Sequence, residues 1–120
     1  MSATDTEKIA FWEAHPGSRM RIVASGEKMT VVHSIIKPGS EIPRHSHPHE
    51  QIAYCLQGEA TFQIGDKTFQ IKKGYSFIIP PNMMHSGKII GDQEYVSIEA
   101  FSPPRHDLLR GEFKPEESRG

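Results

Sequence analysis

Hydrophobic residues recur along the chain in short runs that are separated by turn-forming residues. The runs are four to eight residues long and are rich in β-branched and aromatic side chains. Runs of this length, bounded by Gly, Pro, Asn or Asp, are typical of β-strands. The predicted strands are residues 29–36, 51–56, 60–64, 68–71, 76–79 and 95–101. Many short strands with regular turns predict an all-β fold, an antiparallel sandwich or barrel.

Alternation within the runs predicts which side chains share a face of the sheet. In the run 95–101, Val96, Ile98 and Ala100 alternate with Ser97, Glu99 and Phe101. The second set therefore shares one face, which puts a carboxylate and an aromatic ring side by side. Gly65-Asp66-Lys67 is expected to close a hairpin. Helix is expected only as short turns over residues 7–15 and 105–110, with a polar tail from residue 111.

Composition restricts the class of protein. The 120 residues are enough for one domain, the formal net charge is −1, and there is no long basic run that would suit a nucleic acid. No apolar run approaches the length of a membrane span, and the opening residues lack the apolar core of a signal sequence, so a cytoplasmic location is expected. The single cysteine, Cys55, excludes an intramolecular disulfide and a cysteine-based zinc site. Seven histidines remain, three of them within residues 45–49.

These histidines are candidate metal ligands. On a strand, His45 and His47 would point to the same side and could aim two imidazoles at one point. His85 follows an apolar strand and a proline turn, and a barrel can return it to the first pair. Neutral imidazoles in such a group suit a divalent transition metal. The alternative is a solvated, histidine-rich loop.

The spacing of these residues resembles the two motifs of the cupin family. The first motif matches Gly39, His45, His47, Gln51 and Gly58, and the second matches Gly74, Pro80, Asn82 and His85. The chain departs from the cupin pattern in having Gln51 for Glu, Asn82 for Gly and Ile89 for Asn. The resemblance implies a single-domain jelly-roll barrel. Residues 1–28 would form an N-terminal arm and first strands, 29–104 the barrel core and 105–120 a C-terminal tail.

The cupin resemblance also implies a metal centre. Its ligands by motif position would be His45, His47, Gln51 and His85, with Glu50 or His49 as alternatives to Gln51. The metal would be one divalent ion, nickel, zinc, iron, cobalt or manganese, and no other cofactor is expected. A neutral amide in place of a carboxylate leaves the metal its full charge, which favours an anionic, oxygen-rich substrate. The resemblance further implies a homodimer.

A narrower resemblance concerns the pectin degradation proteins, small cupins that convert unsaturated uronate monomers to open-chain keto forms. It rests on the segments His45-Ser46-His47-Pro48-His49-Glu50-Gln51 and Phe101-Ser102-Pro103-Pro104-Arg105. It implies an isomerase- or lyase-like enzyme for a small acidic substrate, with Glu99, Phe101 and Arg105 as catalytic residues. The family usually has Asp where this chain has Glu99. Arg105 has an alternative role, pairing with Asp107. The alternative functions are an iron-dependent dioxygenase and a cupin that binds a small anion without turnover.

The remaining candidates are expected to be structural. Cys55 is interpreted as an apolar filler, and Tyr54, of opposite parity, as an outward-facing residue. His33 is expected in the core or on the surface, and His15 and His106 in solvent. Phe11 and Trp12 are candidates for an arm that covers a partner subunit.

Overall fold

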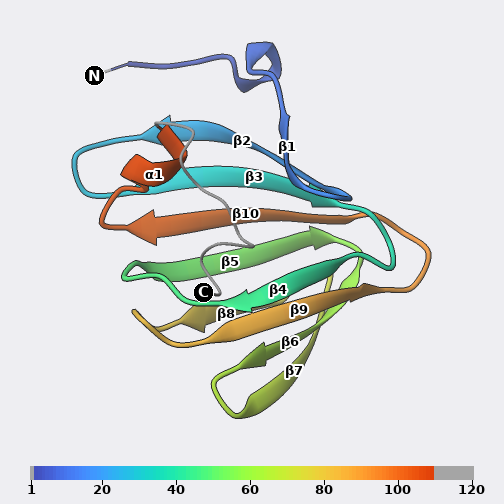
Figure 1. Ribbon diagram of the computed structural model, residues 1–120. Coiled ribbons are helices and arrows are strands. Elements are labelled where there is room, and N and C mark those ends of the chain that lie inside the picture. Colours follow the sequence, from blue (N-terminus) through green and yellow to red (C-terminus); the bar gives the residue numbers. More distant parts are fainter. Residues whose placement is uncertain (1, 110–120) are drawn as a thin grey trace.

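Ten strands in two antiparallel sheets form the protein, and the computed structural model describes residues 2–109 (Figure 1). The larger sheet has six strands in the order β1-β2-β3-β10-β5-β8. β10 thus lies between β3 and β5, although it comes last in the chain (Figure 1). The strands of this sheet are β1 (Trp12–His15), β2 (Ser18–Ser25), β3 (Thr30–Ile36), β5 (Glu50–Gln57), β8 (Ser76–Ile79) and β10 (Tyr95–Ser102).

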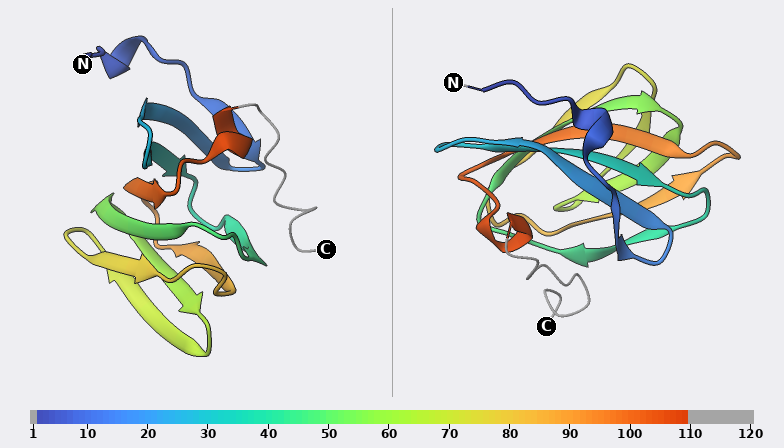
Figure 2. Two further views of the ribbon diagram at one scale, coloured as in Figure 1. Left: turned by 90° about the vertical axis from the view of Figure 1, so that its left-hand side faces the viewer. Right: turned by 90° about the horizontal axis from the view of Figure 1, so that it is seen from above.

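The smaller sheet has four strands in the order β4-β9-β6-β7 and faces the first, as in a jelly-roll (Figure 2). β6 and β7 form the predicted hairpin, which turns at Gly65 and Asp66. The strands of this sheet are β4 (Glu41–His45), β6 (Glu59–Ile64), β7 (Lys67–Lys72) and β9 (His85–Ile90). The predicted all-β, cupin-type jelly-roll is confirmed.

The apolar core lies between the two sheets. Its larger part comes from both sheets and includes Phe62 of β6, Ile79 of β8 and Tyr95 of β10. Cys55 is fully buried in it, as predicted, and Tyr54 points outward with 48% of its surface exposed. A smaller cluster joins Val32, Phe101 and Leu108, in which the short helix α1 (His106–Leu109) contributes Leu108. The cavity described below lies between these two clusters.

The N-terminal segment packs on the outer face of its own sheet. The buried guanidinium of Arg21 donates hydrogen bonds to the backbone oxygens of Thr6 (2.7 Å) and Ile9 (3.3 Å). Arg21 also lies 4.4 Å from the centre of the Phe11 ring, and that ring contacts the imidazole of His33. Phe11 therefore packs against its own chain, and His33 faces away from the barrel interior. The homodimer stays a prediction.

Two elements near the N-terminus differ from the sequence prediction. Instead of a helical turn over residues 7–15, the structure has a short 3-10 helix, η1 (Thr6–Lys8), capped by Asp5, and then strand β1. The strand forms because Gly17, at φ +82°, turns the chain so that β1 can pair with β2. The second helical turn is found as α1, and Arg110 and the tail beyond it lie outside the described residues.

Strand β9 was also missed by the hydrophobic pattern, because Ser86, Gly87 and Lys88 interrupt it. Gly87 is required by packing, since a Cβ atom there would lie 2.6 Å from the Phe62 ring. Among residues 2–109, no helix is long and apolar enough to cross a membrane.

Candidate metal centre and active site

Three histidines meet where the ends of β4 and β9 pair. His45 is the last residue of β4 and His85 the first of β9, and the two are register partners. His47 lies in the loop after β4, so the strand-parity argument for His45 and His47 was wrong, although the two imidazoles do converge. One ring nitrogen from each of the three histidines lies within 4.8 Å of the others. The three histidines are thus positioned to hold a metal ion.

The turn before β9 fixes the loop that carries His47. Asn82 donates its backbone N–H to the backbone oxygen of His47 at 2.8 Å. Asn82 has φ +67°, in the left-handed region that Asn tolerates better than other residues with a Cβ atom. This explains why Asn can replace the glycine of the cupin pattern at position 82.

Backbone contacts select the ligand nitrogen of each histidine. Each Nδ1 lies 2.7 to 3.2 Å from the carbonyl oxygen of a residue two positions away. The pairs are His45 with Pro43, His47 with His49 and His85 with Met83. Because a carbonyl oxygen only accepts, these contacts favour the tautomer with hydrogen on Nδ1, which leaves the lone pair of Nε2 available to a metal.

The histidines are held in the neutral form. Burial, followed by the positive charge of Arg105, lowers the pKa of His47 to about 3. Burial also lowers the pKa of His85 to about 4, despite the hydrogen bond to the backbone of Met83. Burial likewise lowers the pKa of His45. At neutral pH the ring nitrogens therefore offer lone pairs to a metal without prior loss of a proton.

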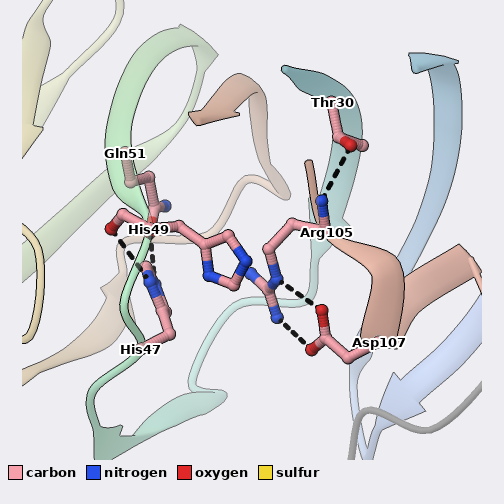
Figure 3. Close-up of polar contacts among 6 residues, drawn as sticks. All are labelled: Thr30, His47, His49, Gln51, Arg105 and Asp107. Carbon is pink, nitrogen blue, oxygen red and sulfur yellow. Dashed lines mark hydrogen bonds and ion pairs between the residues drawn. The ribbon is translucent and has the colours of Figure 1, made fainter. Parts of the chain in front are cut away.

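Gln51 of β5 brings an amide oxygen to the same point. Its Oε1 lies 3.0 Å from Nε2 of His47 (Figure 3). A neutral imidazole carries one N–H, so His47 can donate either to Gln51 or, from Nδ1, to the carbonyl oxygen of His49. In the second case the lone pairs of Nε2 and Oε1 face each other, an arrangement that a bound cation stabilises. The donor set of three imidazoles and an amide oxygen thus fits a divalent transition metal.

The alternatives to Gln51 lie farther from the cluster. Glu50 points outward and is exposed. His49 is buried, but it is not part of the group of three histidines whose ring nitrogens lie within 4.8 Å of one another. The geometry thus favours Gln51, and its ligation of the metal stays a prediction.

Glu99 of β10 lies beside Gln51 on the cavity wall. Both of its carboxylate oxygens accept hydrogen bonds, one from Nε2 of Gln51 and one from Oγ of Ser97, each at 2.7 Å. Burial raises the pKa of Glu99 above its usual range, against the opposing effects of Ser97, Arg105 and Gln51. A carboxyl group with a raised pKa binds its proton more readily than an ordinary carboxylate does, which suits a proton-transfer role.

Phe101 and Arg105 complete this wall. The Arg105 guanidinium is 4.6 Å from the centre of the Phe101 ring, and only 3% of Arg105 is exposed. Asp107 accepts two hydrogen bonds from Arg105, at 3.0 and 2.9 Å (Figure 3). Burial alone would raise the pKa of Asp107, but the hydrogen bonds and charge of Arg105 hold it below its usual range. The pairing considered as an alternative role for Arg105 is therefore present, in a residue that also lines the cavity.

Sequence reasoning missed three polar residues that line the same cavity. They are His15 at the end of β1, Ser18 of β2 and Ser34 of β3. Ser18 and Ser34 are 3% and 4% exposed, so both side chains are buried at the cavity wall. His15 is partly buried at the cavity rather than solvated, whereas His106 is exposed as predicted. The sequence predicted a helical turn where β1 lies, so no sequence signal placed His15 at the site.

Comparisons with known proteins agree with this architecture. KdgF from Halomonas sp. superposes with a TM-score of 0.84 and 25% identity, over 91% of this chain and 99% of that one. An uncharacterized protein, MJ1618, from Methanocaldococcus jannaschii is 30% identical over 84% of this chain and 86% of its own length. H2HPP isomerase from Bacillus subtilis is 30% identical over 78% of this chain.

The match with this chain spans less than half of the length of two curated relatives. The match spans 39% of H2HPP isomerase and 46% of another relative. The family model described as "Cupin domain" matches residues 32–101, which contain every site residue predicted from the sequence except Arg105. With the two facing sheets and the three converging histidines, this match shows that the chain belongs to the cupin family.

Proposed function

We propose that this cupin is a metal-dependent, isomerase- or lyase-like enzyme that converts unsaturated uronate monomers to open-chain keto forms. One observation carries the proposal: the three-histidine cluster shares a cavity with a carboxylate, an aromatic ring and a guanidinium. The resemblance to the pectin degradation proteins and the structural similarity to KdgF support the substrate class. The relative named an isomerase supports the reaction class.

The cavity residues match the parts of such a substrate. The guanidinium of Arg105 suits the carboxylate of the uronate. The Phe101 ring suits the apolar face of the sugar ring. The buried hydroxyls of Ser18 and Ser34 can hydrogen-bond to sugar hydroxyls, which would otherwise lose their contacts with water.

The reaction is a proton transfer coupled to ring opening. The anomeric hydroxyl loses a proton, the ring C–O bond breaks to leave an aldehyde and an enol, and the carbon next to the enol carbon gains a proton as the ketone forms. No atom is gained or lost overall. We assign the movement of this proton to Glu99, and the assignment is supported by its raised pKa and its position at the cavity. A bound metal would act as a Lewis acid that polarises a substrate oxygen.

Glu99→Gln is expected to lower kcat for unsaturated monouronates by about 10²- to 10⁴-fold, because the amide cannot exchange the proton. Turnover is followed as loss of the ring double-bond absorbance, with the metal content of each protein determined. Glu50→Gln is the matched control, since Glu50 is an exposed carboxylate near the same site. Turnover by Glu99→Gln equal to that of the wild type would exclude Glu99 as the proton carrier. No turnover by fully metallated wild type would reject the substrate assignment in favour of a dioxygenase or a binding protein.

Arg105→Lys is expected to raise KM for the uronate about tenfold, with a smaller effect on kcat. Lysine keeps the charge but cannot make the planar two-pronged contact with a carboxylate. Steady-state kinetics at constant metal occupancy measures both values. An unchanged KM would show that Arg105 serves only to pair with Asp107.

A further inference from the structure

The hydrogen bonds of Glu99 connect it to the metal centre. Oε1 of Glu99 accepts from Nε2 of Gln51, and Oε1 of Gln51 lies 3.0 Å from Nε2 of His47. Ser97 donates to the other oxygen of Glu99. Ser97, Glu99, Gln51 and His47 thus form a continuous chain of contacts that ends at the candidate metal-binding nitrogen.

The sheet itself sets this geometry. Phe101 of β10 is the register partner of Gln51 in β5, so Glu99 is the diagonal neighbour of Gln51 on the inner face. Ser97 follows two residues away on the same face of β10. Three of the four residues therefore lie on two paired central strands, where little backbone motion is available to change their spacing.

A carboxylate at position 99 determines which end of the Gln51 amide faces the histidines. Both oxygens of Glu99 act as acceptors, one from Nε2 of Gln51 and the other from Oγ of Ser97, so the carboxylate holds the amide nitrogen of Gln51 toward itself. The amide oxygen is then turned toward His47. With the amide rotated by half a turn, an N–H would point at the metal position and the oxygen lone pairs would face the Glu99 carboxylate.

We propose that Glu99 is a positioning residue for the metal centre, in addition to its proton-transfer role. Supported by Ser97, it holds Gln51 so that the amide oxygen joins the three imidazoles as a ligand. The cupin pattern has a glutamate at the position of Gln51, bound directly to the metal. In this chain the carboxylate belongs to Glu99, which is one hydrogen bond farther from the metal position than a glutamate at position 51 would be. From there it can also face the substrate. The inference rests on the metal centre of the proposed function and not on the identity of the substrate.

The test is the affinity of the protein for Co²⁺, measured by competition with a chelator in the absence of substrate. Loss of an outer residue that orients a metal ligand commonly weakens binding about 10- to 100-fold. We expect Glu99→Met, which has similar length but no acceptor, to show a loss in that range. Glu99→Gln should show a smaller loss, because its amide oxygen can still accept from Gln51. Asp107→Asn, which removes a carboxylate of the same cavity region that does not contact Gln51, should stay within about threefold of the wild type.

A double-mutant cycle separates positioning from charge. Once Gln51 is replaced by Ala, Glu99 has no ligand to orient, so Gln51→Ala/Glu99→Met should bind Co²⁺ as Gln51→Ala alone does. The visible absorption of bound Co²⁺ should change in Glu99→Met, as in Gln51→Ala, because the amide oxygen is no longer held at the metal. Wild-type affinity in Glu99→Met would overturn the proposal. Equal losses of Co²⁺ affinity in Glu99→Met and Glu99→Gln would also overturn it, because they indicate an effect of charge alone. The same holds if the double variant loses as much further affinity as Glu99→Met does on its own. These outcomes do not depend on uronate turnover.

Discussion

We predict that the wild type is isolated with bound metal and that a His85→Ala variant is isolated without it. His85 supplies one of three imidazole nitrogens that lie within 4.8 Å of one another, and it is 5% exposed. The strands cannot move together to fill the space left by the imidazole, because His45 is held at the end of β4 by its pairing with β9. Affinity should fall by more than the roughly 100-fold that is typical for loss of an outer residue.

Metal analysis after gel filtration measures this effect as the molar ratio of metal to protein. His106→Ala is the matched control, since His106 is an exposed histidine on α1, outside the three-histidine group. Wild-type metal content in His85→Ala would show that the three histidines are not the ligand set. The same loss in His106→Ala would indicate metal bound elsewhere on the surface.

Gly58→Ala is expected to lower the free energy of unfolding by about 2–4 kcal/mol. This is the largest effect on stability that we predict for a single substitution. Gly58 has φ +87°, and a Cβ atom there would lie 2.6 Å from the backbone oxygen of Glu94 and 2.9 Å from Cα of Tyr95. Both contacts are with backbone, so a side-chain rotation cannot relieve them. Movement of Tyr95 would also disturb β10, which carries Glu99.

Gly91→Ala separates the two causes of this effect. Gly91 also has a positive φ, +77°, but no atom lies within 4 Å of the position of its Cβ. Gly91→Ala should therefore lower the free energy of unfolding only by the conformational strain, about 1–2 kcal/mol. Urea unfolding of the metal-free proteins measures both free energies, because bound metal would add its own contribution to stability. Equal effects at the two glycines would show that the close approach of Glu94 is not a constraint.

The strands that could be predicted are those whose buried residues alternate with polar ones or form β-branched runs. The run 95–101 is an example: the buried Ser97 and Phe101 and the cavity-facing Glu99 share one face, as predicted. β9 lacked that signal because a core contact with Phe62 requires a glycine in its middle. β1 lacked it because its formation depends on the turn at Gly17 and on pairing with β2.

The candidate site shows the same division. The spacing of His45, His47 and His85 could be recognised along the chain, and the structure brings the three together. The hydrogen bond from Gln51 to Glu99 joins residues 48 positions apart, and it depends on the register of β5 against β10. Neither hydrophobic pattern nor motif spacing specifies such a register, so the link between Glu99, the proposed proton carrier, and Gln51, the proposed metal ligand, required the structure.

The most direct test of the proposed function is turnover of an unsaturated monouronate by one preparation in three states: as isolated, stripped with a chelator, and reloaded with metal. The ring double-bond absorbance reports the reaction. We predict that turnover is lost on stripping and returns in proportion to the metal bound, up to one ion per chain. Full turnover by the stripped protein would contradict the metal-dependent reaction, and no turnover by the reloaded protein would contradict the uronate substrate.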